Sequence, residues 1–178
     1  MLRRATTTLV CFGAILLSAC GSGQDARQAS EKDVPKSPLI GRIVSFESPA
    51  EVQSRLDPSV LPWEVVENSA LAPGDRRPPF HNYVVTVANY SDLGHSGELE
   101  LYFFNDRLME ARFIPRNLDS YLLRLRDSRG IDLAASTEAS LPPYTLVSIA
   151  KYRDGRTYVS WIDTRLSKEF DDWIRRYS

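Results

Sequence analysis

Two β-hairpins restrict the possible folds of this chain more than any other feature, because their apolar residues match in one register only. In the first, Glu98–Phe104 and Arg107–Ile114 flank Asn105-Asp106. A two-residue turn there places apolar residues opposite charged ones on the same face. A three-residue loop pairs apolar residues with one another: Phe103 with Met109, Leu101 with Ala111, and Leu99 with Phe113. Because a slip of one residue moves every side chain to the other face, burial predicts the three-residue loop, with Glu100 opposite Arg112 on the second face.

The second hairpin lies near the C-terminus, where Thr145–Tyr152 and Arg156–Ile162 flank Arg153-Asp154-Gly155. A three-residue loop with Gly155 in the left-handed conformation again pairs apolar residues: Val147 with Trp161, and Ile149 with Val159. A two-residue Asp-Gly turn pairs Ile149 with Ser160, which is a poorer match. The pattern therefore predicts a three-residue hairpin with a glycine bulge.

Capping residues indicate three short helices. Ser48-Pro49-Ala50-Glu51 forms a capping box with proline at the first helical position. Asn117 is expected to cap a second helix that runs to about Asp127, and Ser167 a third. Apolar residues at helical spacing mark the core-facing sides, namely Leu118, Tyr121, Leu122 and Leu125, then Phe170, Trp173, Ile174 and Tyr177.

Three further segments have the β-branched and aromatic content of strands: Leu39–Phe46, Trp63–Glu67 and Tyr83–Asn89. With the two hairpins and the helices, they predict an α+β fold. We expect a mostly antiparallel sheet of about six or seven strands, with the three short helices packed on one side. Residues 39–178 contain no repeat of fixed period and suffice for one core, so a single domain is predicted there.

The N-terminus has the three parts of a secretory signal. Arg3 and Arg4 give it a positive start, Leu9–Leu17 is an apolar run, and the small residues Ser18 and Ala19 follow. As a helix, this run would be roughly 14 Å long, about half the hydrocarbon thickness of a bilayer. A signal is therefore predicted rather than a membrane span.

The apolar run closes in Leu17-Ser18-Ala19-Cys20, which resembles the lipobox of bacterial lipoproteins. The resemblance implies that residues 1–19 are removed by cleavage between Ala19 and Cys20. It also implies that the Cys20 sulfur, a good nucleophile as the thiolate, carries a diacylglyceryl group and that its new amine is acylated. The alternative is an ordinary secretory signal with a chance cysteine.

In that family an aspartate after the cysteine retains the protein at the inner membrane of Gram-negative cells. Gly21 stands there in this chain, so the resemblance implies an outer-membrane lipoprotein of the cell envelope that faces the periplasm. Two or three acyl chains on Cys20 would make a durable membrane anchor. Residues 20–38 would then be the lipidated cysteine and a flexible polar tether, with a coil span of roughly 23 Å.

Cysteine and charge counts exclude several classes. Cys11 and Cys20 are the two cysteines of the chain. Because the first leaves with the signal and the second carries lipid, the body has no disulfide, thiolate metal site or cysteine nucleophile. The net charge is −1, which argues against nucleic acid as a partner. With 43% hydrophobic residues, disordered and multi-span membrane classes are excluded.

Candidate catalytic residues are few. His81 begins a strand, and His95 lies in the loop Ser91–Gly97, in which Asp92 to Ser96 also hold an aspartate and a serine. Neighbours in sequence do not by themselves form a Ser–His–Asp triad, so an ordinary turn is favoured. The acidic pairs Glu98/Glu100 and Asp171/Asp172 fit solvated faces, although a dispersed glycosidase-like pair stays open. Common metal, phosphate and dinucleotide motifs are missing, so no cofactor, metal or catalytic residue is predicted.

Arginines gather at three places: Arg124, Arg126 and Arg129; Arg153 and Arg156; Arg175 and Arg176. They either stabilise helix ends or form a patch for an acidic partner. The proline-rich connection Leu71–Pro79 is either a plain surface loop or an extended segment offered to a partner.

These observations favour a lipid-anchored, non-catalytic accessory or interaction module with an envelope protein as partner, and they leave its oligomeric state open. In element order, a helix followed by an antiparallel sheet, the chain resembles small lipoproteins of the outer-membrane β-barrel assembly machinery. Two alternatives are an envelope hydrolase, using dispersed carboxylates or the His95 loop, and a carrier of a small apolar ligand. A pocket at His95, an Arg-rich or apolar patch, or an enclosed apolar cavity would distinguish these functions.

Overall fold

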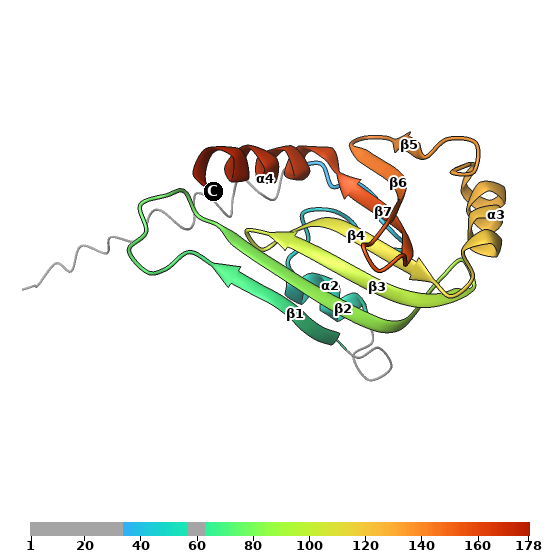
Figure 1. Ribbon diagram of the computed structural model, residues 1–178, viewed down its shortest axis with the longest axis horizontal. Coiled ribbons are helices and arrows are strands. Elements are labelled where there is room, and N and C mark those ends of the chain that lie inside the picture. Colours follow the sequence, from blue (N-terminus) through green and yellow to red (C-terminus); the bar gives the residue numbers. More distant parts are fainter. Residues whose placement is uncertain (1–33, 57–62) are drawn as a thin grey trace, which may run out of the picture. The chain divides into compact units, whose positions relative to one another are not determined.

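The computed structural model describes residues 34–56 and 63–178. Pro35–Ser178 forms one compact unit, built on a seven-stranded antiparallel sheet of order β1-β2-β3-β4-β7-β6-β5 (Figure 1). The strands are β1 (Trp63–Ala70), β2 (His81–Asp92), β3 (His95–Phe104), β4 (Arg107–Pro115), β5 (Glu138–Leu141), β6 (Thr145–Lys151) and β7 (Thr157–Asp163). The helices are α2 (Pro49–Arg55), α3 (Leu118–Arg129) and α4 (Thr164–Tyr177). The predicted α+β class is confirmed. Signal residues 1–19 and the lipidation position Cys20 lie outside the described residues.

The sequence predicted that all three helices pack on one side of the sheet. In the structure they pack on both sides. Successive residues of a strand point to opposite faces. Phe103 of β3 belongs to a core that also contains Val52 of α2 and Tyr121 of α3. The next residue, Phe104, lies in a second core with Trp173 of α4. Therefore α2 and α3 cover one face and α4 covers the other. The prediction was wrong because an apolar stripe indicates that a helix packs on the sheet but not which face it covers.

The β3–β4 hairpin turns over two residues, where three were predicted. Asn105 and Asp106 have φ of 49° and 61°, the left-handed values of a type I′ turn. Leu101 nevertheless faces Ala111, as predicted, because the register shifts between Tyr102 and the following residue. This bulge restores the expected burial pattern beyond the tighter turn. The predicted loop length was wrong because a bulge, as well as the length of the loop, sets the register of this hairpin.

The β6–β7 hairpin agrees with its prediction. Val147 pairs with Trp161, as the apolar match required. Gly155 has φ of 88°, and the Tyr152 N–H donates to the Arg156 carbonyl at 2.9 Å across the three-residue loop.

The predicted caps are correct for two helices and wrong for the third. The Ser48 capping box begins α2, and Asn117 begins α3 by accepting from the Ser120 N–H at 3.0 Å. The helix α4 starts after Asp163 rather than Ser167, because the Asp163 carboxylate accepts from the N–H groups of the first turn.

Residues 35–46 form a partly buried strap, whereas a strand was predicted over Leu39–Phe46. An isolated bridge joins Pro38 to Val44, and Gly41 reverses the chain with φ of 59°. A Cβ on Gly41 would lie 2.5 Å from the Tyr90 hydroxyl oxygen, so glycine is required there. The apolar content correctly indicates burial but not sheet pairing. Since the strap begins at 35, it also includes the last residues assigned to the tether.

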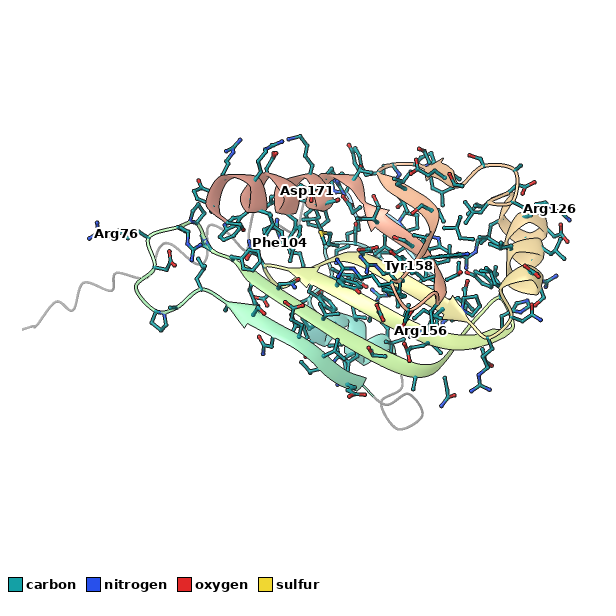
Figure 2. The ribbon with its side chains drawn as sticks, in the orientation of Figure 1. Arg76, Phe104, Arg126, Arg156, Tyr158 and Asp171 are labelled. Carbon is teal, nitrogen blue, oxygen red and sulfur yellow. The ribbon has the colours of Figure 1, made fainter. Side chains whose placement is uncertain are left out.

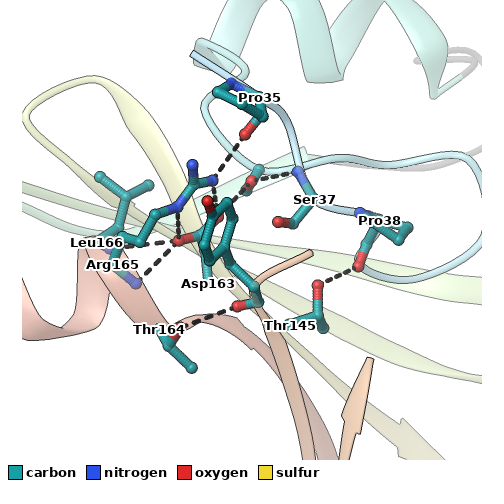
Figure 3. A network of polar contacts seen from close by, with 10 residues as sticks. Pro35, Ser37, Pro38, Thr145, Asp163, Thr164, Arg165 and Leu166 are labelled. Carbon is teal, nitrogen blue, oxygen red and sulfur yellow. Dashed lines mark hydrogen bonds and ion pairs between the residues drawn. The ribbon is translucent and has the colours of Figure 1, made fainter. Parts of the chain in front are cut away.

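A network centred on Asp163 fastens the strap to the start of α4 (Figure 3). The Asp163 Oδ2 atom accepts from Ser45 Oγ and from Arg165 Nη2, each at 2.7 Å. Arg165 Nη2 also donates to the Pro35 carbonyl at 2.7 Å, and its guanidinium lies 3.8 Å from the Tyr144 ring centroid. Burial alone would raise the pKa of Asp163, but hydrogen bonds from Arg165 and Ser45 hold it below its ordinary value.

Candidate functional site

Two arginine and three tyrosine side chains form a stack on the sheet face that carries α4. Its members, in spatial order, are Arg156, Tyr152, Tyr158, Arg112 and Tyr102, and we call this set the Tyr–Arg stack. Figure 2 shows Arg156 and Tyr158 on the β6–β7 hairpin. Arg156 is exposed and the other four side chains are partly exposed.

Strand pairing explains why these residues share one face. Tyr102 of β3 pairs with Glu110 of β4, and Arg112, two residues along β4, pairs with Ser160 of β7. Tyr158 lies two residues before Ser160, so it points to the same side. The junction between β4 and β7 therefore joins residues from two separate hairpins into one surface.

The contacts within the stack are close enough for cation–π attraction. The Arg112 guanidinium carbon lies 4.1 Å from the Tyr102 ring centroid and 5.0 Å from that of Tyr158. The Tyr152 and Tyr158 centroids are 4.4 Å apart, and the Arg156 guanidinium carbon lies 5.2 Å from Tyr152. The five planar groups thus form one continuous ladder.

Glu110 holds Arg112, which lies between Tyr102 and Tyr158, in place. Arg112 Nε and Nη2 donate to the two Glu110 carboxylate oxygens at 2.7 and 2.9 Å. Ser160 Oγ donates to the same carboxylate at 2.7 Å. Burial alone would lower the pKa of Arg112, but the bonds to buried Glu110 raise it above its ordinary value. Arg112 is therefore a permanently charged, fixed part of the surface.

Glu100 fixes the tyrosine hydroxyls. Its Oε2 atom accepts from the Tyr102 hydroxyl at 2.7 Å and also from the Tyr152 hydroxyl. Burial, reinforced by these bonds to a carboxylate, raises the pKa of both tyrosines. The two hydroxyls are therefore protonated at neutral pH and donate to Glu100.

The Asp92–Ser96 loop does not assemble a Ser–His–Asp arrangement. Tyr121 Oη and Arg129 Nη2 donate to the Asp92 carboxylate at 2.9 and 3.0 Å. His95 Nδ1 lies instead 3.4 Å from Ser120 Oγ. Burial, together with Asp92, raises the pKa of Tyr90 to about 12. Asp92 is thus part of a buried polar cluster under α3.

Several of the other predicted candidates also have partners within the chain. His81 bridges β1 and the β3–β4 turn, with Nδ1 2.9 Å from Asp106 Oδ1 and Nε2 2.8 Å from Asn68 Oδ1. Among the predicted arginines, several form ion pairs with carboxylates: Arg126 with Asp127, Arg129 with Asp92, Arg156 with Glu98 and Asp154, and Arg175 with Asp172. Glu100 binds two tyrosine hydroxyls of the Tyr–Arg stack, rather than lying on a fully solvated face as expected.

The connection Leu71–Pro79 is fastened to α4. The Trp173 indole N–H donates to the Pro78 carbonyl at 3.1 Å, and Arg77 Nη1 donates to the Tyr177 carbonyl at 2.9 Å. Phe80, the next residue, packs on Trp173 with ring centroids 4.3 Å apart. The segment therefore closes the second core.

A pocket of about 250 Å³ lies beside α3. Its lining combines apolar and charged residues, among them Leu122, Leu123 and Asp132. This volume is smaller than that of typical ligand sites. Within 34–56 and 63–178, no group of three or more His, Cys, Asp or Glu side chains is arranged to hold a metal ion. The same residues include no helix with the length and apolarity needed to cross a membrane.

Sequence reasoning missed the Tyr–Arg stack, although it placed Glu100 opposite Arg112. The signal available was the alternation that puts Tyr102 and Arg112 on the second face of the first hairpin. What the sequence could not supply was the pairing of β4 with β7, which brings in Tyr158. No protein-family model matches the chain, and no curated protein matches it.

Proposed function

We propose that this chain is a lipid-anchored envelope lipoprotein that works without catalysis, by binding a protein partner through the Tyr–Arg stack. The observation that carries the proposal is the fixed geometry of the stack. Tyrosine and arginine are enriched among the residues that dominate binding energy at interfaces. Because Glu100 already holds Tyr102 and Tyr152, and Glu110 holds Arg112, little conformational entropy would be lost at these three side chains on binding.

The anchoring part of the proposal rests on the sequence Leu17–Cys20 and on the position of Pro35. The lipid on Cys20 would attach the protein to the outer membrane, and Gly21 would direct it there. If the segment from Cys20 to Pro35 behaves as a flexible coil, it would span roughly 21 Å. Arg165 holds the Pro35 carbonyl, so the tether would leave the body from a fixed point beside α4.

Replacing Cys20 by serine is expected to move the protein from the membrane fraction to the soluble fraction, because the hydroxyl cannot take the place of the thiolate in lipid attachment. The measurement is fractionation of host cells followed by mass spectrometry of the mature N-terminus. Cys11→Ser is the matched control, since that residue would leave with the signal and membrane attachment should persist. A C20S protein that still sediments with membranes, or a wild-type protein with a bare thiol at position 20, would contradict the anchor.

A photo-crosslinking side chain in place of Tyr158 is expected to capture an envelope protein in living cells, because this position lies within the proposed interface. The control is the same side chain in place of Leu123, which is 53% exposed on α3. One discrete adduct at position 158 and none at 123 supports the proposal. No adduct at 158, or a partner captured at 123 alone, overturns the assignment of the interface to the stack.

A further inference from the structure

The outer end of the Tyr–Arg stack is occupied by a weakly held side chain. The Arg156 side chain is 50% exposed, and it pairs with Glu98 Oε1 at 3.1 Å and with Asp154 Oδ2 at 2.8 Å. Its guanidinium lies over the Tyr152 ring. Ion pairs at such exposed positions typically contribute little to stability. Arg156 can therefore leave this position at small cost, unlike Arg112, which is bound to buried Glu110.

The position that Arg156 occupies is suited to a cation. It offers the face of Tyr152, whose hydroxyl is turned to Glu100, and the carboxylate of Glu98, which is 40% exposed. Glu98 and Glu100 alternate along β3 and so lie on the same face. The stacked rings already hold one guanidinium internally at Arg112. With Arg156 displaced, this end of the face presents aromatic surface and carboxylates without their cation.

We propose that the partner bound by the stack presents a basic protein segment, and that an arginine or lysine of this segment replaces Arg156 between Tyr152 and Glu98. This inference rests on the proposed function and names the chemistry of the partner. Arg156 is then an internal placeholder that competes with the partner. A guanidinium fits better than an ammonium, because its plane can stack on the ring while it donates to the carboxylate.

The test uses the full mature chain and a fluorescent penta-arginine peptide as the probe, with binding followed by anisotropy. Arg156→Gln is expected to strengthen binding by about three- to tenfold, since it removes the competing cation and restores negative potential. Arg153→Gln is the matched control on the same hairpin loop. It makes the same change in net charge and is expected to alter affinity less than twofold. Glu98→Gln is expected to weaken binding at least threefold.

Equal strengthening by R156Q and R153Q would show that bulk charge alone governs binding, and would overturn the inference. So would an E98Q protein that binds the peptide as wild type does. Thermal unfolding of the three variants checks that each is folded. The crosslinking experiment separates the two proposals. If position 158 captures a partner whose crosslinked segment lacks Arg and Lys, only the inference about Arg156 is contradicted. If position 158 captures no partner, the proposed function is contradicted.

Discussion

Replacing Arg112 by methionine is expected to lower the free energy of unfolding by about 3–5 kcal/mol, because it leaves a buried charge without its counter-ion. The Glu110 side chain is 8% exposed. Of the groups described around it, Ser160 would then be its remaining hydrogen-bond donor. Urea denaturation followed by circular dichroism measures the change. Because Arg112 also stacks on Tyr102 and Tyr158, the variant should lose partner capture at position 158 as well.

The double variant Arg112→Met/Glu110→Met provides the decisive comparison. Removing both charges leaves no unpaired ion, so much of the lost stability should return, as found generally when a buried pair is replaced by apolar residues. Arg126→Met serves as the surface control, since Arg126 is 48% exposed and pairs with its neighbour Asp127. It should change stability by less than about 0.5 kcal/mol. A loss below about 1 kcal/mol in R112M would show that Glu110 is not dependent on this arginine.

Local patterns in the sequence predicted most of the paired residues in the two hairpins, although Phe103 pairs with Leu108 and not with Met109 as expected. The alternation of Leu99 and Leu101 with charged residues specified which side chains face each other, and Ala111 and Phe113 face them in the structure. The loop length was wrong because a bulge near Tyr102 compensates for a two-residue turn. Burial of apolar side chains thus determines the register more strongly than turn length does, because many apolar contacts depend on the register.

The candidate site could not be predicted to the same extent. Arg112 and Tyr158 each lie in a strand that was predicted, but they meet only because β4 pairs with β7 across an intervening 41 residues (116–156). Either strand offers a plausible apolar face to several others, so alternation does not select its neighbour. Long-range pairing depends on how the whole core fits together, and α2, α3 and the strap all contribute to that core.

The start of α4 illustrates a similar limit. Both Asp163 and Ser167 are good capping residues by type. Asp163 caps the helix because its carboxylate also accepts from Ser45, a residue 118 positions away in the chain. Capping preferences consider neighbouring residues only, so they cannot predict a contact between residues so far apart in the sequence. The same contact binds residues 39–46, which were predicted as a strand, to the start of α4.

Asp163→Ala is accordingly expected to lower the free energy of unfolding by about 3–4 kcal/mol at neutral pH. This loss combines a helix cap of about 1 kcal/mol with the charge-assisted hydrogen bonds from Ser45 and Arg165. Hydrogen exchange should also accelerate at the Ser45 N–H, which donates to the Ser37 carbonyl at 2.8 Å, because the strap loses its attachment. Asp171→Ala, an exposed position on the same helix, is the control and should stay within about 0.5 kcal/mol of wild type.

The pH dependence of this difference tests its electrostatic origin. The pKa of Asp163 in the folded state lies below its ordinary value, whereas the pKa of an aspartate in an unfolded chain is about 3.9. The ionised carboxylate therefore contributes its full stabilisation above roughly pH 5, and this contribution decreases as the pH falls through the folded-state pKa. The gap between wild type and D163A should accordingly be constant from about pH 5 to 8 and narrow below pH 4. A gap that stays constant down to pH 2 would show that apolar contacts, rather than the charge of Asp163, hold the strap to α4.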